Sequence, residues 1–477
     1  MDGGEPHRRL LHDRQGGHAR AIFNLVVPLA HKATAMRITD TAGSHQGWSG
    51  AVSPLIGPGL RRGDVDSTNR RSPLATPTTR GIRTSMMAIR TTTTRVASFA
   101  PGPSADHADA VPAGFSFEDL VVAYFDCRKN KRNTHNALAF EQNLERNLCR
   151  LADELADGSY RPGRSICFVV TRPKPREVWA ADFRDRVVHH LLYNHISPRF
   201  YASFIADSCA CIPGRGTLYA ARRLESKVRS VTKNWARPAW YLKCDLANFF
   251  VSIDKRVLRA QLAARITEPW WMWLTELVLM HDPRPDVQMQ APAELLALVP
   301  PYKSLLNQPA HRGLPIGNLS SQFFANVYLD SLDQHAKHQV RARHYVRYVD
   351  DFVLLHESPQ WLNAAHDDIE AFLPRELGAR LNPSKTILQP VERGIDFVGQ
   401  VISPWVRTTR PRTVNEGARR LRQMDAADLH AAANSYFGLL RQATGSHTDR
   451  ARFANIVRKR GHSVNRQLTK AYRSHTT

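Results

Sequence analysis

Two adjacent carboxylates, Asp350 and Asp351, stand in the middle of an apolar and aromatic run that extends from His344 to Leu355. Apolar residues on both sides of the pair predict two strands joined by a tight turn, with the acids at the turn. Neighbouring carboxylates repel each other, and a bound divalent cation is the usual compensation. An Asp-Asp pair alone is more often a solvated turn, so a metal site requires a further ligand.

A third carboxylate, Asp245, lies about 100 residues upstream at the end of the β-prone run Trp240–Asp245. Two aromatic residues, Phe249 and Phe250, follow it. Three carboxylates at strand ends can hold two magnesium ions, which lower the pKa of an attacking hydroxyl and stabilise a leaving pyrophosphate. The sequence therefore predicts a two-metal site for in-line displacement at a phosphate.

The two acidic segments resemble motifs A and C of a reverse transcriptase palm. Further segments follow in the order of that family: Lys174–Val178 (fingers motif), Phe183–His190, Ser208–Thr217, Gly313–Gln322 (motif B), Leu381–Thr386 (motif D) and Phe397–Gly399 (primer-grip hairpin). The series covers roughly residues 115–405. The resemblance implies an α+β fold with the fingers, palm and helical thumb of a right-hand polymerase, and the activity of an RNA-directed DNA polymerase.

The resemblance also implies a set of site residues. The expected catalytic residues are Asp245, Asp350 and Asp351, and the same three with Leu246 are the expected ligands of two Mg²⁺ ions, for which Mn²⁺ is an alternative. The expected nucleotide-binding residues are Lys174, Arg176, Phe250, Ile316, Gly317, Gln322 and Lys385, and those of the primer grip are Phe397 and Gly399. Phe250 is the expected gate against a 2′-OH, and Lys385 the expected proton donor to the departing pyrophosphate.

Ile316 bears on the position of the chain within the family. Many reverse transcriptases have Gln before this glycine, and an aliphatic side chain cannot make the hydrogen bonds of an amide. The run Ile316–Gln322 is similar to the signature of diversity-generating retroelement enzymes, which copy a template RNA with errors at adenines and redirect the cDNA to a variable gene. The segment Phe183–His190 also resembles that clade.

Other readings stay open at this point. Ile316 could serve only to pack against its neighbours, without any effect on fidelity. The chain could also be another stand-alone bacterial reverse transcriptase, either one of antiviral defence or one that resembles a group II intron maturase. A hypothesis of a different class is a non-catalytic RNA-binding scaffold. The complete set of three aspartates argues against that hypothesis, since an inactive relative has no need to keep them.

The net charge of +23 and the pI of about 10.2 indicate a polyanionic partner. Residues 406–477 carry 15 Lys and Arg against 4 Asp and Glu, which fits a thumb that grips a duplex. The expected partners are template RNA, a DNA or RNA primer and dNTPs, and a small basic accessory protein is a further candidate. No membrane partner is expected, because no apolar run reaches about 18 residues.

The chain divides into three parts by composition. Residues 1–110 are rich in Gly, Pro, Ser and Thr without a sustained period, which predicts disorder, and translation from Met86 is an alternative. Residues 111–405 are the expected fingers and palm, and 406–477 the basic helical thumb. We expect strands at 166–170 and 240–245, helices at 182–197, 254–280, 321–338, 415–442 and 449–472, and a Pro-rich insertion at 281–312.

The six cysteines show no spacing typical of a zinc site or a disulfide framework. We therefore expect buried, reduced cysteines in a cytoplasmic protein.

Overall fold

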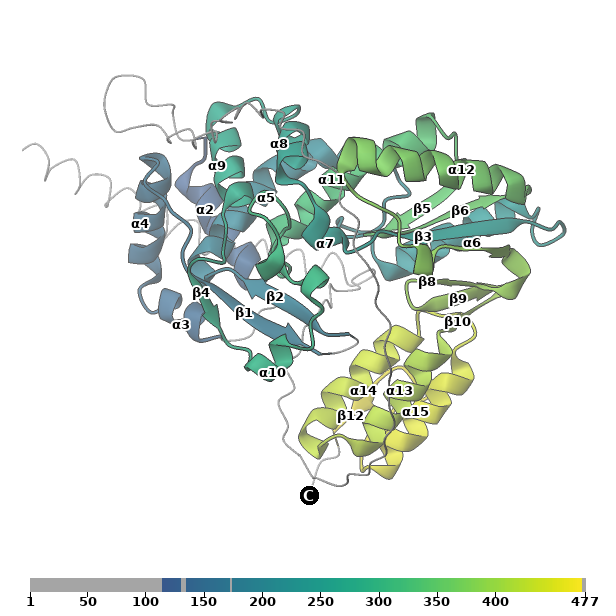
Figure 1. Ribbon diagram of the computed structural model, residues 1–477. Helices are drawn as coiled ribbons and strands as arrows, with labels where there is room; N and C mark the ends of the chain where they lie inside the picture. Colours follow the sequence, from purple (N-terminus) through teal and green to yellow (C-terminus); the bar gives the residue numbers. More distant parts are fainter. Residues whose placement is uncertain (1–113, 130–133, 172–173, 474–477) are drawn as a thin grey trace, which may run out of the picture.

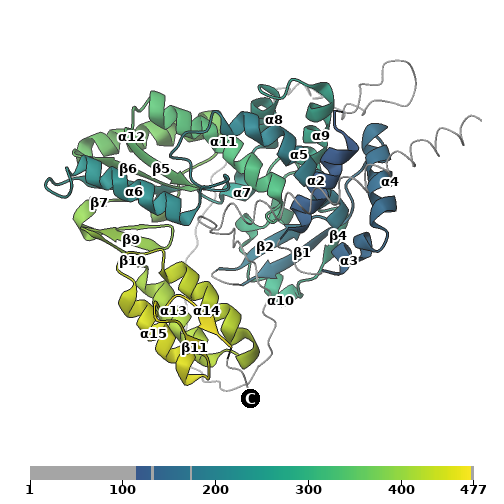
Figure 2. The same cartoon turned by 180° about the vertical axis from the view of Figure 1, so that it is seen from behind.

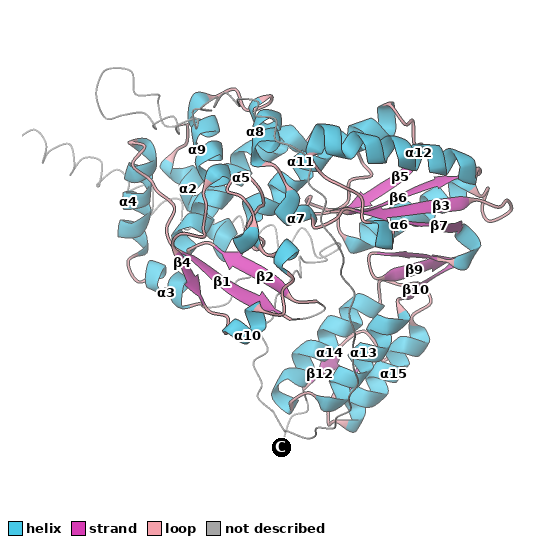
Figure 3. Ribbon diagram, in the orientation of Figure 1, coloured by secondary structure: helices cyan, strands magenta, loops and turns pink. Residues whose placement is uncertain are grey.

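A computed structural model of the chain describes residues 114–129, 134–171 and 174–473. The described residues form three lobes, to which we give the names fingers, palm and thumb (Figure 1). Helices and strands occur together in the first two lobes, and the third is mainly helical (Figure 3). The expected α+β class is confirmed. The tract 1–110, expected to be disordered, and the alternative start at Met86 lie outside the described residues.

The fingers lobe consists of helices packed against a small mixed sheet of order β2-β1-β4, in which β1 pairs antiparallel with β2 and parallel with β4. The strands are β1 (Ser165–Val170), β2 (Arg176–Ala180) and β4 (Val287–Met289), and the helices are α2 (Phe117–Arg128), α3 (His135–Glu141), α4 (Leu144–Ala156), α5 (Phe183–Tyr201), α8 (Lys255–Ala263), α9 (Pro269–Met280) and α10 (Ala293–Leu296). Strand β4 lies in the expected insertion 281–312, so part of that insertion is built into the sheet.

The palm lobe is a four-stranded antiparallel sheet of order β5-β6-β3-β7 with helices on both faces (Figure 2). Its elements are α6 (Thr217–Val231), β3 (Trp240–Asp245), α7 (Phe249–Ser252), α11 (Leu319–His338), β5 (His344–Tyr348), β6 (Asp351–His356), α12 (Pro359–Phe372) and β7 (Ile387–Pro390). Successive side chains of a strand point to opposite faces. Tyr241 and Val353 thus pack in a core with α6, whereas Cys244 and Phe352 pack in the larger core that includes α11 and α12.

A three-stranded sheet of order β10-β9-β8 lies between the palm and the thumb. Its strands are β8 (Ile395–Phe397), β9 (Gln400–Ser403) and β10 (Val406–Thr409), and the thumb consists of α13 (Pro411–Gln423), α14 (Ala426–Leu440), α15 (His447–Lys459), β11 (Ser463–Val464) and β12 (Ala471–Tyr472). Leu421, Phe437 and Phe453 are buried in the core of the thumb. The first residues of the expected thumb range 406–477 therefore form a strand that pairs with β9.

The helix expected at 254–280 is divided into α8 and α9. The second helix begins at Pro269, a residue that favours the first position of a helix. None of the described helices combines the length and apolar character that a membrane span requires.

Both helices expected in the thumb are wrong in their bounds. The range 415–442 is interrupted where Met424 adopts an extended conformation (φ −73°, ψ 161°), between α13 and α14. The range 449–472 is helical only to Lys459, and Gly461 then adopts φ +84°, as glycines often do after a helix. A short β-hairpin follows.

Candidate active site

The palm sheet carries the three predicted aspartates at one end. Asp245 is the last residue of β3 and Asp351 the first of β6, and the antiparallel register places these two directly opposite each other. Asp350 occupies the turn between β5 and β6. The amide of Leu246 donates a hydrogen bond of 3.2 Å to the carbonyl oxygen of Asp350, which ties the end of β3 to this turn.

The turn that carries Asp350 has an unusual backbone. Tyr348 pairs with Asp351, so only Val349 and Asp350 connect the two strands. Val349 has a φ of +57°, in the left-handed region that β-branched residues rarely adopt. Two-residue hairpin turns need a positive φ at their first central position and usually place Gly, Asn or Asp there. A valine at this position indicates that surrounding contacts hold the turn in its conformation.

Two lysines neutralise the outer aspartates. The Nζ of Lys385 lies 2.6 Å from Oδ1 of Asp245, and the Nζ of Lys243 lies 3.1 Å from Oδ2 of Asp351. Lys385 was an expected site residue, whereas Lys243 was not. Lys243 stands two residues before Asp245, and residues at this spacing share a face of a strand, which was the available signal.

Burial and the charges of neighbouring carboxylates disfavour the ionised forms of Asp350 and Asp351. Burial raises the pKa of Asp350, and the charge of Asp245 raises it further. Burial also raises the pKa of Asp351 to about 6, although Lys243 opposes this shift. Oδ1 of Asp351 is buried and has no hydrogen-bond partner among the described residues. A buried carboxylate oxygen without a donor, next to two other carboxylates, fits a site for a divalent cation.

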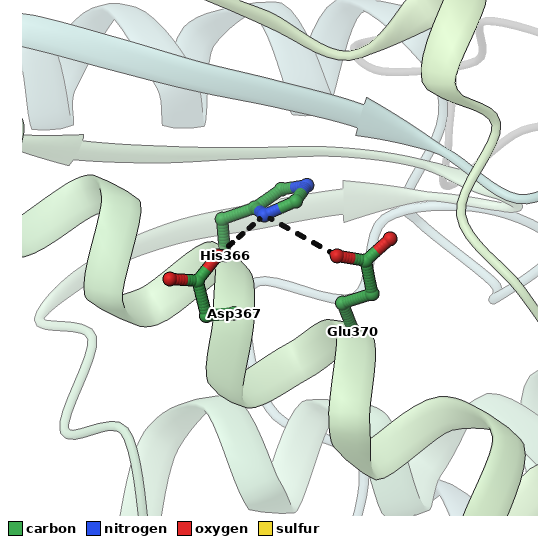
Figure 4. Close-up of side chains that lie close together, drawn as sticks. All are labelled: His366, Asp367 and Glu370. Atoms are coloured by element: carbon green, nitrogen blue, oxygen red, sulfur yellow. Dashed lines mark hydrogen bonds and ion pairs between the residues drawn. The ribbon is translucent and has the colours of Figure 1, made fainter.

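The described residues contain one other group with metal-ligating side chains. It consists of His366, Asp367 and Glu370 on α12, whose ligand atoms lie within 4.8 Å of one another (Figure 4). The oxygens of the three aspartates are not as close together as this. However, the side chains of Asp367 and Glu370 are 79% and 58% exposed, and His366 and Glu370 are neighbours along a helix surface. We assign no metal to this group, because solvated charge pairs of this kind are common.

The fingers strand β2 is joined to the loop that precedes α11. The amide of Trp179 donates a hydrogen bond of 2.7 Å to the carbonyl oxygen of Ile316. Gly317 has a φ of +132°, and a Cβ there would lie 2.8 Å from the carbonyl oxygen of Trp179, so this approach requires glycine. Arg176, at the start of β2, is exposed, and its charge opposes the burial that raises the pKa of Asp350. The strand that begins with Arg176 is thus tied to the loop of Ile316 and Gly317, and the charge of Arg176 acts on Asp350.

Comparison with known proteins finds a family model that matches the central part of the chain. Residues 172–402 match the family model described as "Reverse transcriptase (RNA-dependent DNA polymerase)". Over these residues, which make up just under half of its length, the chain is similar to the reverse transcriptase family. Its domain is therefore that of an RNA-directed DNA polymerase, an enzyme class that uses an RNA template, a primer, nucleotides and divalent metal ions.

Two individual proteins are also similar to this chain. The chain is 23% identical to Protein YkfC of Escherichia coli (strain K12) over 283 residues, which cover 52% of this chain and 69% of YkfC. A solved structure of apo telomerase from Candida tropicalis, truncated from its C-terminal domain, superimposes with a TM-score of 0.37 at 14% identity. That match covers 51% of this chain and about half, 54%, of the telomerase chain.

The two aromatic residues after Asp245 differ in their burial within the reverse transcriptase domain. Phe249 is 2% exposed and belongs to the core, as expected. Phe250 is half-buried, its ring centre lies 5.4 Å from that of Phe249, and its carbonyl oxygen accepts a hydrogen bond of 2.9 Å from the amide of Leu314. The segment after β3 is thus joined to motif B. Lys174, in the fingers motif, is exposed.

The remaining expected residues lie in different surroundings. Gln322 is half-buried on α11, with its Oε1 3.5 Å from Sγ of Cys211. Phe397 is fully buried in the core beneath the palm sheet, so its ring supports the β8–β9 turn from inside. Val398, with φ +46°, and Gly399, with φ +82°, form that turn. A primer-grip contact at this hairpin would therefore come from the turn and not from the ring of Phe397.

Proposed function

We propose that this protein copies a template RNA into cDNA by two-metal nucleotidyl transfer. The observation that carries the proposal is the register of β3 with β6, which sets Asp245 opposite Asp351 beside the turn of Asp350. Template RNA, a DNA or RNA primer and dNTPs are the proposed partners. We propose a cytoplasmic location, because the cysteine spacing shows no disulfide framework.

The residues present fit a pair of divalent cations. Asp245, Leu246, Asp350 and Asp351 would hold two Mg²⁺ ions, with Mn²⁺ as an alternative. When bound, such ions lower the pKa of the attacking hydroxyl and stabilise the pyrophosphate that leaves. The buried Oδ1 of Asp351, which has no donor among the described residues, supports this assignment.

Basic side chains of the protein would bind the phosphates of the nucleotide, and an aromatic ring would contact its sugar. Arg176, the first residue of β2, and Lys174, two residues before it, are exposed and would bind the triphosphate, whose negative charge they complement. Phe250 would exclude a 2′-OH through the bulk of its ring. Lys385, whose side chain is 48% exposed beside Asp245, would donate a proton to the departing pyrophosphate. Gln322 would contact the nucleotide from α11.

We further propose that the enzyme belongs to a diversity-generating retroelement and acts with a small basic accessory protein. Ile316 supports this proposal, because its side chain offers the nucleotide no hydrogen bond. A stand-alone reverse transcriptase of antiviral defence, or one that resembles a group II intron maturase, is the second candidate, since such enzymes share the same palm motifs. The scaffold hypothesis is disfavoured by the match of residues 172–402 to the polymerase family model.

Primer extension on an RNA template tests the catalytic proposal. Purified protein with Mg²⁺ should extend a primer with dNTPs, and the Asp245→Asn variant should not, because a neutral amide removes one of the charges that would hold the cations. Binding of the template–primer, measured by gel shift, should be similar for both proteins. Failure of the wild-type protein to extend any primer, with the accessory protein supplied, would refute the catalytic proposal.

A further inference from the structure

Arg347 is a buried arginine whose hydrogen-bonding capacity is fully used. The residue is 1% exposed, and it lies on β5 two residues before the turn that carries Asp350. Its Nε and one Nη2 proton bind the carboxylate of Asp333 at 2.7 and 2.6 Å, and its other Nη2 proton binds Oγ of Ser208 at 2.9 Å. The two protons of Nη1 bind Oδ1 of Asn326 at 3.3 Å and the carbonyl oxygen of Val349 at 3.0 Å.

The contact with Val349 connects this buried group to the candidate active site. Val349 is the residue with φ +57°, and its carbonyl belongs to the peptide group that leads into Asp350. A β-branched residue disfavours this conformation, so the turn depends on contacts that hold it. The charged donor of Arg347 holds one side of the turn, and the amide of Leu246 holds the carbonyl of Asp350 on the other.

The partners of Arg347 fix the guanidinium from α11, from the segment before α6 and from the β5–β6 turn. Asp333 is 0% exposed on α11 and also accepts a hydrogen bond of 2.8 Å from the hydroxyl of Tyr345 on β5. Asn326 also lies on α11, while Ser208 lies in the segment before α6. A pair of apolar residues could fill the same space, and often does so at no loss of stability. Apolar side chains could not provide a directed hydrogen bond to the carbonyl of Val349.

We propose that Arg347, oriented by Asp333, is a positioning residue that holds the turn so that Asp350 presents its carboxylate to the divalent cations. Arg347 touches neither nucleotide nor metal in this proposal, and acts through the carbonyl of Val349. The inference rests on the proposed role of Asp350 as a metal ligand. It goes beyond that role because it names what keeps a disfavoured turn conformation in place.

The experiment compares the wild type with Arg347→Lys, which keeps the charge, and with the double variant Arg347→Met/Asp333→Leu, which leaves no unpaired buried charge. Primer extension is measured over a range of Mg²⁺ concentrations. We expect both variants to bind template–primer like the wild type and to require more Mg²⁺ for half-maximal extension. The maximal rate at saturating dNTP should fall about 10-fold, as expected for the loss of one charge-assisted hydrogen bond, with the KM for dNTP nearly unchanged.

A rescue experiment separates positioning from general stability. Glycine adopts a positive φ without the cost that valine incurs. Adding Val349→Gly to Arg347→Lys should therefore restore part of the lost rate and lower the Mg²⁺ requirement. Because glycine fills no space around position 347, this rescue could not come from repacking there. A purely structural role of Arg347 predicts a lower melting temperature, an unchanged Mg²⁺ requirement per active molecule and no rescue, and this result would overturn the inference.

A milder variant covers the case in which both Arg347 variants fail to fold. Ser208→Ala removes one contact of the guanidinium and leaves the pair with Asp333 intact, so a small rise in the Mg²⁺ requirement is expected with unfolding unchanged. An unchanged Mg²⁺ requirement in this folded variant would then count against the inference. A wild-type protein without polymerase activity would instead refute the proposed function itself.

Discussion

Asp245 and Asp351 stand opposite each other on β3 and β6, and each forms an ion pair with a different lysine. Lys385 reaches Asp245 from the segment before β7, whereas Lys243 reaches Asp351 from within β3. Because Lys243 is held in the sheet and also donates a hydrogen bond of 2.8 Å to the backbone of Asp396, it is the more fixed of the two cations. Under the proposed function, Lys385, whose side chain is 48% exposed, would be the cation that exchanges its carboxylate for a phosphate.

Replacing Asp350 and Asp351 together by alanine should abolish cDNA synthesis and leave RNA binding largely intact. These acids would hold metal ions rather than the template, so only the chemical step should be lost. Primer extension with Mg²⁺ measures the first effect and gel shift the second. Extension near the wild-type rate would show that the carboxylates are not catalytic.

The exposed acids of α12 provide a matched control for this variant. Asp367→Ala with Glu370→Ala also removes two carboxylates, and it dismantles the group around His366. We expect extension and its Mg²⁺ requirement to stay as in the wild type. A raised Mg²⁺ requirement in the control would mean that the group on α12 binds a functional ion.

Phe250→Val should admit ribonucleotides, because the smaller side chain would no longer meet a 2′-OH. Phe250 is half-buried, so the change should not open a large cavity. Single-nucleotide extension with dNTP and with rNTP gives the ratio of incorporation. Phe250→Tyr keeps the bulk of the ring and should retain the discrimination of the wild type. An equal ratio in the wild type and the valine variant would exclude Phe250 as the gate.

Gly317→Ala should weaken nucleotide binding strongly. The new Cβ would lie 2.8 Å from the carbonyl oxygen of Trp179, and φ +132° is itself unfavourable for alanine. Since β2 carries Arg176, a shift of β2 should raise the KM for dNTP more than it lowers the melting temperature. Gly438→Ala on α14 is the control, because nothing lies within 4 Å of its added Cβ. A normal KM for dNTP in Gly317→Ala would show that the contact with β2 is dispensable.

Strands β3, β5 and β6 of the palm could be predicted because their residue pattern is local, whereas β7 was not predicted. Tyr241 and Cys244 face different cores, and both are apolar, so the run before Asp245 is recognisable in the sequence alone. Asp245 closes this run and Asp351 opens another, so both acids could be placed at strand ends. What could not be predicted is the pairing of Arg347 with Asp333, or of Lys243 with Asp351, because such pairs depend on how separate elements pack.

The bounds of the thumb helices could not be predicted in the same way. Leu421 and Leu440 recur with helical spacing on both sides of Met424, and no Pro or Gly marks the break between them. The end of α15 did carry a local signal, since Gly461 follows a helix that is rich in basic residues near its end. The position of Phe397 in the core is likewise set by packing against the palm sheet, which a motif cannot reveal.

The basic thumb should contribute to the salt dependence of template–primer binding. Deleting residues 406–477 would also remove β10 and the buried Arg407, which lies 2.6 Å from Glu225, so neutral substitutions are the cleaner test. The variant replaces four exposed cations by glutamine: Arg412, Arg422, Arg458 and Lys459. Each lost phosphate contact should reduce the slope of log K against log salt by about 1.

The exposed Arg375, after α12, provides the control for the thumb variant. Arg375→Gln removes a surface cation from the palm, and we expect it to leave the slope unchanged. Equal slopes for the fourfold variant and the wild type would mean that these thumb cations are only a solvated surface.

Ile316→Gln should raise fidelity, most visibly opposite template adenines. The backbone carbonyl of Ile316 is held by the amide of Trp179, so the substitution changes the side chain without removing this anchor. An apolar contact is non-directional and tolerates misaligned pairs that a hydrogen bond would penalise. One hydrogen bond is worth roughly 0.5–1.5 kcal/mol, so discrimination should change by about 2- to 10-fold. Errors are counted by template base in cDNA copied from one RNA, with Ile316→Leu as the apolar control and the accessory protein present. If the wild-type enzyme makes no excess of errors at adenines, the diversity-generating proposal fails and the stand-alone reverse transcriptase takes its place.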